Sequence, residues 1–377
     1  MKALSVSLIA LLLVIACTTT QAPNAESIQH KADQVAQWQL DHMDNFDYIR
    51  TFVDHTEAPT GWVQAAFYIG LNRWYEATQN PVFRQALIDK AKANRWQLGP
   101  LPWHADDQAF AQVYLALADD TPAADITPTQ SAFDKIIAAN HEDSLEFIRD
   151  ETGTAEGTCQ KRWCWSDALF MAPPAWAALS RITGEERYLD YALREFKATT
   201  DYLFDPDDHL YYRDSRFFDR KSAYGNKVFW SRGNGWVFAG LPLLLEQMPE
   251  NHPQWGELIE QFRKMAYAFK DLQADTGLWA SSLMDYAHQP LAETSGSSFI
   301  LFGLAWGINR QLLPQDDFLP TVEKGWRAVN AKVSPEGRLG WVQQVGNAPD
   351  QVLASDTQLY GTGAYLLAAS ELIHTFN

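Results

Sequence analysis

The stretch GWVQAAFYIGLNRWYEATQNPVFRQALIDKAKAN, residues 61–94, carries apolar residues at helical spacing on both sides of the break TQNP. Such spacing predicts two amphipathic helices, and the break predicts a tight turn between them. A second unit of this kind, PPAWAALSRITGEERYLDYALREFKATTDYLF, spans residues 173–204 and is broken at TGEE. Its leading prolines suit the first turn of a helix, where the missing N–H is not needed. The repeated pattern predicts a fold built from helical hairpins.

The remainder of the chain extends the same pattern. Further helical stretches occupy residues 235–248, 255–273, 296–313, 318–333 and 361–376. The Gly/Asp-rich pieces between helices, such as DPDDHLYYRD at 205–214, predict turns and small hairpins, not strands of a large sheet. About twelve helices, with Gly-aromatic starts to alternate ones, fit an all-α (α/α)6 toroid of six helical hairpins around a central cleft. Periodicity alone allows an open helical array equally well.

The N-terminus has the pattern of an export signal. Lys2 is followed by an apolar run, residues 3–16, which is too short to span a bilayer as a mature helix. Small residues precede Cys17, as bacterial lipoprotein processing requires; the alternative is an ordinary cleaved signal with an incidental cysteine. We therefore expect a signal peptide at 1–17 ending at a lipidated Cys17, a flexible tether at 18–27, and one catalytic domain at 28–377. This organisation predicts an exported lipoprotein that meets the outer membrane only through its lipid.

The amino-acid composition limits the classes of molecule that the protein could bind. A net charge of −17 argues against nucleic acid, since phosphate binding needs a basic face. Fifteen tryptophans among 377 residues are typical of a sugar-binding cleft, although they also suit a large helical core. Cys159 and Cys164 either form a local disulfide or remain two thiols. Without nearby histidines they make a poor metal site.

Carboxylates and one arginine lie at predicted loop-to-helix junctions. In WHADDQAF (103–110), Asp106 and Asp107 could cap a helix or carry chemistry. In WCWSDALFM (163–171), Asp167 is also either a cap or a catalyst. The aromatic residues around it, Trp165 among them, would desolvate its carboxyl group and raise the pKa, which prepares it to donate a proton. Arg232 in WSRGNGW (230–236) could clamp a substrate carboxylate or serve the structure.

Six motifs in order over residues 60–300 resemble glycoside hydrolase family 105, the unsaturated rhamnogalacturonyl and related uronyl hydrolases. They are GWVQAAFYIGL, HADDQAF, WSDALFMAPP, TGEERYLDY, WSRGNGW and ETSGSS. The resemblance implies an (α/α)6 barrel without a metal or other cofactor. It implies an oligosaccharide substrate that a lyase has left with a 4,5-unsaturated uronic acid, and hydration of the C4=C5 double bond. One carboxyl group acts there first as acid and then as base, unlike the usual glycosidase pair.

Matched motif by motif, the resemblance assigns candidate site residues. Asp167 becomes the acid/base and Asp107 the second carboxylate, with Asp106 as the fallback and as a substrate-binding residue. The remaining substrate-binding candidates are Arg232, Trp236 as a stacking ring, His104, Trp165 and Arg213. Some relatives carry a histidine at the position of Arg213, which leaves the parent polysaccharide open between rhamnogalacturonan, ulvan and others.

Two other functions compete with this one. A non-catalytic glycan-binding surface lipoprotein would account for the tryptophans and the anchor equally well. A sugar 2-epimerase would keep the toroid but needs histidine pairs in the cleft, and His104 is the only histidine inside a strong motif.

Overall fold

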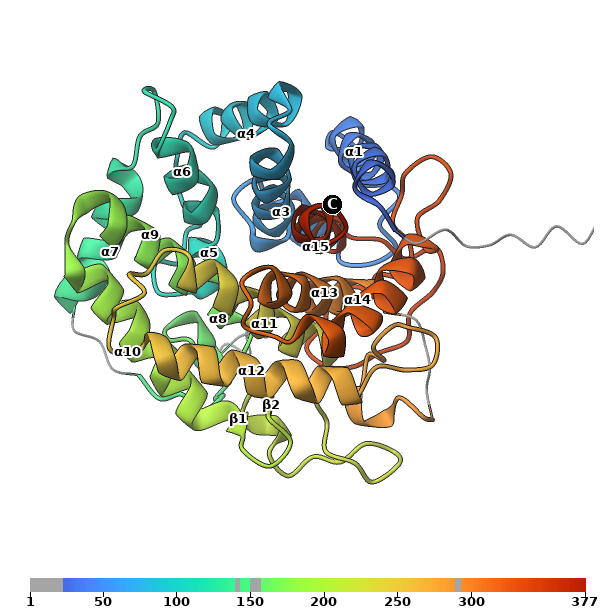
Figure 1. Ribbon diagram of the computed structural model, residues 1–377. Helices are drawn as coiled ribbons and strands as arrows, with labels where there is room; N and C mark the ends of the chain where they lie inside the picture. Colours follow the sequence, from blue (N-terminus) through green and yellow to red (C-terminus); the bar gives the residue numbers. More distant parts are fainter. Residues whose placement is uncertain (1–22, 140–142, 150–156, 289–292) are drawn as a thin grey trace, which may run out of the picture.

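Helices form nearly all of the regular structure in the computed structural model, which describes residues 23–139, 143–149, 157–288 and 293–377. Figure 1 shows them as two concentric layers. The inner layer consists of α3 (Trp62–Thr78), α6 (Phe110–Ala118), α9 (Pro173–Thr183), α11 (Ser231–Leu245), α13 (Thr294–Asn309) and α15 (Leu359–Thr375). The outer layer consists of α1 (Ala25–Asp41), α4 (Pro81–Ala93), α7 (Thr127–Ala139), α10 (Glu186–Leu203), α12 (Trp255–Asp271) and α14 (Gln315–Asn330).

The two layers differ in how their sequences meet the core. All of α11 is buried, and α13 is buried from Thr294 to Ile308, as expected for helices that are apolar on every side. Outer helices bury one face only: α10 buries Tyr188, Leu189, Ala192, Leu193 and Phe196 and leaves its other side to solvent. These two patterns are the reason that the inner helices pack in the middle and the outer ones cover them.

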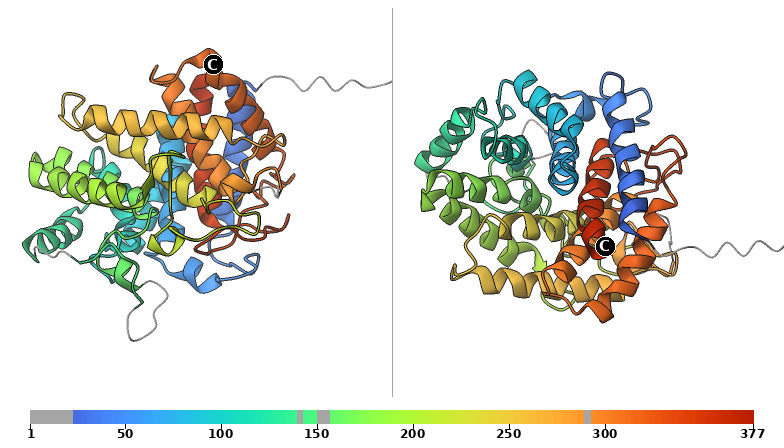
Figure 2. Two further views of the ribbon diagram at one scale, coloured as in Figure 1. Left: turned by 90° about the horizontal axis from the view of Figure 1, so that it is seen from below. Right: turned by 45° about the horizontal axis from the view of Figure 1, so that its top comes forward.

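The inner helices form a closed ring. Each contacts the next, from α3 through α6, α9, α11 and α13 to α15, and α15 returns to α3. The last contact is backbone to backbone, because a Cβ on Gly70 would lie 2.1 Å from the carbonyl oxygen of Gly363. The sixth hairpin joins α15 to α1, so the two ends of the chain complete the toroid, as Figure 2 shows. The (α/α)6 prediction is thus confirmed, and the open array is excluded.

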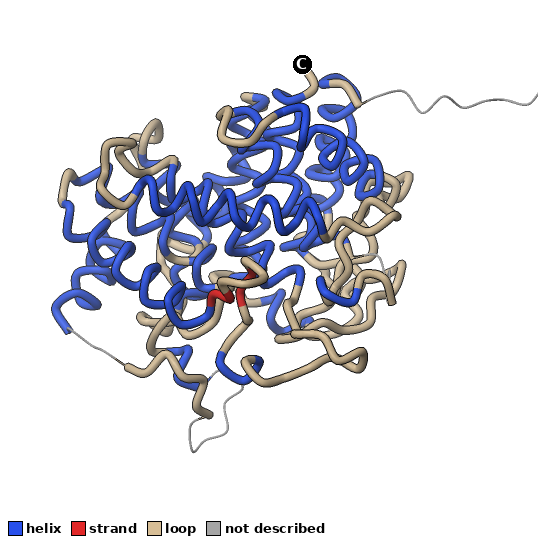
Figure 3. The backbone as a smooth tube through the Cα atoms, turned by 60° about the horizontal axis from the view of Figure 1, so that its bottom comes forward, coloured by secondary structure: helices blue, strands red, loops and turns tan. Residues whose placement is uncertain are grey.

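Short elements and loops gather at one end of the ring (Figure 3). They include α2 (Val53–Glu57), α5 (Ala105–Gln108), α8 (Ala168–Met171) and the two-stranded hairpin of β1 (Phe204–Asp205) and β2 (Leu210–Tyr211). Among the described residues, the connections also contain short 3-10 helices at Gly157–Gln160, Ser215–Phe217 and Leu283–Asp285. Pro173 and Pro174 begin α9 as predicted.

The expected tether at 18–27 is too long at its C-terminal end. Residues 25–27 form the first turn of α1, because Asn24 and Ser27 make a reciprocal capping box. The side chain of Asn24 accepts a hydrogen bond of 2.9 Å from the backbone N–H of Ser27. The predicted signal and Cys17 lie outside the described residues. Within the described part, we find no helix with the length and apolar character needed to cross a membrane.

Candidate active site

A pocket opens at the end of the toroid where the loops gather. Its wall combines Phe52 and His55, Trp62 at the start of α3, Asp106, Trp165, Arg213 and the loop at 345–350. The cavity measures about 380 Å³. That volume falls in the usual range for small-molecule sites, which are concave and combine apolar walls with a few polar groups. The pocket therefore brings together residues from both ends and the middle of the chain.

Asp167 lies beside this pocket at the start of α8, only 9% exposed. Its side chain makes no capping hydrogen bond to the helix, which removes the structural role that the sequence left open. The backbone N–H of Ser166 donates to the carbonyl oxygen of Arg213 at 2.8 Å, so the segment is tied to the neighbouring loop. Burial raises the pKa of Asp167 above its ordinary value, against the opposing charges of Arg213 and Arg232. The group is thus prepared to hold a proton that an exposed aspartate would lose.

Arg213 is the cation nearest to that carboxyl group. Its Nε lies 3.5 Å from Oδ2 of Asp167, and its guanidinium stacks over the Trp165 ring at 4.3 Å. Asp214 holds it from the other side, with Nη1 at 2.8 Å from Oδ2. Burial alone would raise the pKa of Asp214, but Arg216 and Arg213 outweigh it and keep that pKa below its ordinary value. Asp214 is therefore a permanent anion that orients Arg213 toward the pocket.

The pair Asp106 and Asp107 separates in the structure. Asp106 lines the pocket with Trp165 and Arg213, whereas Asp107 faces a different cavity. Asp107 is packed so closely on Gly99 that a Cβ there would come within 1.7 Å of its Oδ1. His104 stands between the two, with Nδ1 at 2.7 Å from Asp107 and Nε2 at 3.7 Å from Asp106. The placement favours the fallback, Asp106, as the second carboxylate at the pocket, and Asp107 as the residue that orients His104.

Arg232 and Trp236 do not reach the open pocket. Arg232 is 1% exposed, and its two terminal nitrogens donate to the carbonyl oxygens of Gln343 at 2.6 Å and Gln344 at 3.0 Å. Trp236 is equally buried and packs against Phe299, with ring centroids 4.1 Å apart. The predicted clamp and stacking ring therefore need correction. Both side chains lie behind the pocket, because α11 is an inner helix buried over its full length.

A model of glycosyl hydrolase family 88 matches residues 31–376. The chain belongs to glycosyl hydrolase family 88. An unsaturated 3S-rhamnoglycuronyl hydrolase of Alteromonas sp. (strain LOR) is 44% identical over 92% of this chain and 87% of its own length. A protein of the same name from Formosa agariphila is 37% identical over 84% of this chain and 85% of its own.

Solved structures agree with this family 88 assignment. A family 88 glycosyl hydrolase from Bacteroides vulgatus superposes with a TM-score of 0.79 at 28% identity, covering 93% of this chain and 99% of the other. A possible family 105 member from Salmonella enterica reaches a TM-score of 0.74 over 94% and 96% at 18% identity, which supports the fold alone. The resemblance to the unsaturated uronyl hydrolases is confirmed, and the protein is a glycoside hydrolase by family.

The motif ETSGSS of this family 88 chain has a structural explanation. Glu293 is fully buried and caps α13, accepting hydrogen bonds from the backbone N–H groups of Ser295 and Gly296 at 2.9 and 2.6 Å. The same carboxylate accepts the N–H of Gln343 at 3.2 Å. The motif therefore anchors the segment that leads into the pocket loop at 345–350.

Sequence reasoning missed the segments at 50–56 and 343–350, which form the pocket mouth. Neither segment has helical or alternating periodicity. The first is held by hydrogen bonds from Thr51 to Gln344 and from Thr56 to Gln358, which lie about 300 positions later in the sequence. The abundance of glutamine near 343 and 358 was the available signal, since buried amides usually hold irregular backbone in place.

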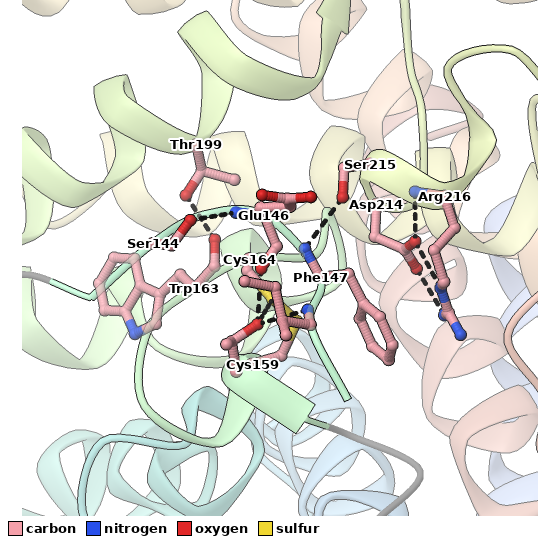
Figure 4. The surroundings of a disulfide bond; sticks show 12 residues. Ser144, Glu146, Phe147, Cys159, Trp163, Cys164, Thr199, Asp214, Ser215 and Arg216 are labelled. Carbon is pink, nitrogen blue, oxygen red and sulfur yellow. Dashed lines mark hydrogen bonds and ion pairs between the residues drawn. A yellow bond between two sulfur atoms is a disulfide. The ribbon is translucent and has the colours of Figure 1, made fainter. Parts of the chain in front are cut away.

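A disulfide lies directly before Trp165. Cys159 and Cys164 are joined, so this local bond replaces the pair of free thiols that the sequence also allowed. Figure 4 shows the segment at 144–147 packed beside it and reaching toward Ser215 and Arg216. Thr158 donates to the carbonyl oxygen of Glu146 at 2.6 Å, and the N–H of Phe147 donates to Ser215 at 2.9 Å. The disulfide thus connects to the turn that carries Arg213 and Asp214.

In the described ranges no group of three or more potential metal ligands occurs.

Proposed function

We propose that this enzyme removes a 4,5-unsaturated uronic acid from the non-reducing end of lyase-generated oligosaccharides by hydrating the C4=C5 double bond. The observation that carries the proposal is the environment of Asp167. Its carboxyl group is buried, makes no capping bond, has a raised pKa, and lies 3.5 Å from a cation on the pocket wall. A proton donor that becomes a stabilised anion is what the first step of hydration requires.

The chemistry follows from those two groups. Protonated Asp167 transfers its proton to C4 of the double bond, and positive charge develops at C5 and the ring oxygen. The carboxylate that remains is stabilised by Arg213 and accepts a proton from water as the water oxygen bonds to C5. The C5 hemiketal opens to a ketone as its hydroxyl proton passes to the ring oxygen, which leaves a hemiacetal at C1. This hemiacetal breaks to an aldehyde, and its hydroxyl proton passes to the departing oxygen, so the next sugar leaves as an alcohol. Asp167 ends protonated again, so one group completes the cycle and no second carboxylate is needed as a nucleophile.

The other pocket residues support binding in this proposal. Arg213 suits the uronate carboxylate, which is attached to C5 next to the reacting bond, because a guanidinium binds a carboxylate through two parallel hydrogen bonds. Asp106 would accept hydrogen bonds from sugar hydroxyls, and Trp165 forms an apolar wall. His104 packs edge-on against Trp165 at 5.4 Å and limits its movement.

The next sugar in the substrate is, on this proposal, a rhamnose. The two relatives from Alteromonas and Formosa both bear the name rhamnoglycuronyl hydrolase. The parent chain would then be of the ulvan or rhamnogalacturonan type. We further propose that the protein is an exported lipoprotein anchored through Cys17 to the outer membrane. A disulfide between Cys159 and Cys164 is consistent with an oxidising compartment.

Loss of ultraviolet absorbance by the double bond, followed across a panel of lyase-generated oligosaccharides, tests the activity. Reaction in water labelled with oxygen-18 tests the mechanism, because hydration places the label at C5 and ordinary glycoside hydrolysis places it at C1. Label at C1 would refute hydration. Binding without any loss of absorbance would instead support a glycan-binding lipoprotein.

A further inference from the structure

Phe52 combines two unfavourable features at the mouth of the pocket. Its side chain is 52% exposed, although large apolar side chains are normally buried. Its backbone is left-handed, with φ 57° and ψ 40°, a conformation that is strained for a bulky residue. Strain of this kind persists only where the surroundings enforce it, and it concentrates at functional sites.

The surroundings of Phe52 do enforce it. On the side before Phe52, Arg50 forms an ion pair with Asp356 at 2.6 Å, and the N–H of Thr51 donates to Gln344 at 3.3 Å. On the side after it, the hydroxyl of Thr56 donates to Gln358 at 2.9 Å. The segment is thus attached on both sides to the last part of the chain, and the Phe52 ring is held outward.

The ring occupies a defined position relative to the chemistry. Phe52 and His55 line the same pocket as Arg213 and Trp165, and their rings meet edge to face at 5.9 Å. Exposure increases from Trp165, at 3%, to Phe52, at 52%. The deep part of the pocket is therefore charged and aromatic, and the outer part offers an apolar ring to solvent.

From these observations we infer that Phe52, supported by His55, forms a binding platform for the sugar next to the unsaturated uronic acid. This inference rests on the proposed function. A sugar ring presents C–H groups on one face, and a 6-deoxy sugar adds a methyl group, so this class gains most from an apolar ring. Binding would cover the exposed ring, which explains why the protein maintains a strained backbone there.

The decisive variant is Phe52→Ala, assayed on an oligosaccharide with a 6-deoxy neighbour and on the methyl glycoside of the same unsaturated uronic acid. The ratio of kcat/KM for the oligosaccharide to that for the methyl glycoside should fall about tenfold, as expected when roughly half of an aromatic side chain loses its burial. Phe52→Tyr should restore most of the ratio. Tyr267→Ala is the control, because Tyr267 is an aromatic residue of similar exposure, 44%, on the outer helix α12. An unchanged ratio in Phe52→Ala would overturn the inference.

Two further measurements separate this inference from the proposed function and from a structural role. Calorimetric binding of the oligosaccharide to Asp167→Asn, with and without Phe52→Ala, reports on the platform without turnover. If the double variant binds more weakly and the wild type shows no activity, only the proposed function is overturned. If the double variant binds as tightly as Asp167→Asn, only the platform is overturned. Phe52→Gly should melt at a higher temperature than Phe52→Ala, since glycine tolerates this backbone, yet show the same loss of ratio. Retention of the ratio in the glycine variant would contradict the platform.

Discussion

Replacing Asp167 by asparagine tests the assignment of the acid/base most directly. The change keeps the shape of the side chain and removes its proton. A positioned acid or base contributes about 10²–10⁴-fold to rate, and here the same group acts in two successive steps. We therefore expect kcat/KM to fall by about 10³–10⁴-fold, equivalent to about 4–5.5 kcal/mol of transition-state stabilisation.

The stability of the same variant provides an independent check. Because the pKa of Asp167 is raised in the folded state from its ordinary value of 3.8, the folded protein holds this proton more tightly than the unfolded chain does. The stability that follows is complete below that value and is lost as the pH rises through the folded pKa. Asparagine is neutral at every pH and avoids this loss. Arg213 keeps its 2.8 Å ion pair with Asp214, so the cation is not left alone.

Urea unfolding at acidic and neutral pH, together with the absorbance assay, measures both effects. The free energy of unfolding of Asp167→Asn relative to wild type should improve as the pH rises, while activity is lost at every pH. Asp190→Asn is the matched control, because Asp190 is exposed on the outer helix α10 and should change neither property. A folded Asp167→Asn protein that keeps wild-type activity would refute the assignment.

Three other variants test the surroundings of the site. Arg213→Gln removes a charge that lowers the pKa of Asp167, so the alkaline limb of the pH profile of kcat/KM should move to higher pH while KM rises. A limb that does not move would show that Arg213 does not influence the catalytic proton of Asp167. Arg232→Met removes the donor to the carbonyl oxygen of Gln344, and one of two donors to that of Gln343, the other being the Tyr360 hydroxyl. It should lower the free energy of unfolding by about 1–3 kcal/mol and raise KM, whereas an unchanged melting temperature would argue against its role in holding the loop. Cys159→Ser with Cys164→Ser opens a short loop and should cost about 2 kcal/mol of stability. The double substitution should also reduce kcat/KM, because the turn that carries Arg213 loses its connection to the disulfide. An unchanged kcat/KM would show that the disulfide contributes to stability alone.

The fold was largely predictable because its elements are long and periodic. Residues 61–94 and 173–204 became α3 with α4 and α9 with α10, with turns at the expected breaks. Closure into a ring was less accessible, since it depends on α15 packing against α3, from the opposite end of the sequence. Local spacing carries no information about which helix lies beside which.

The site was predictable where chemistry and local motif coincide. Asp167, Arg213, Trp165 and His104 lie together, as their motifs implied. Motif matching could not separate Asp106 from Asp107, because adjacent residues on a short helix point about 100° apart and only packing on Gly99 decides. It also made Arg232 a substrate-binding residue, whereas the burial of α11 and two backbone carbonyls place its side chain behind the pocket.

The contact between Gly70 and Gly363 determines at which stage of its synthesis the enzyme can become active. A chain still being synthesised has α3 early, but it lacks the helix that must touch α3 and the glutamines that hold residues 50–56. Pocket and ring are therefore completed together, by residues 343–375. A protein truncated before this segment would have no working site, so activity would begin only after the segment has been made and has folded.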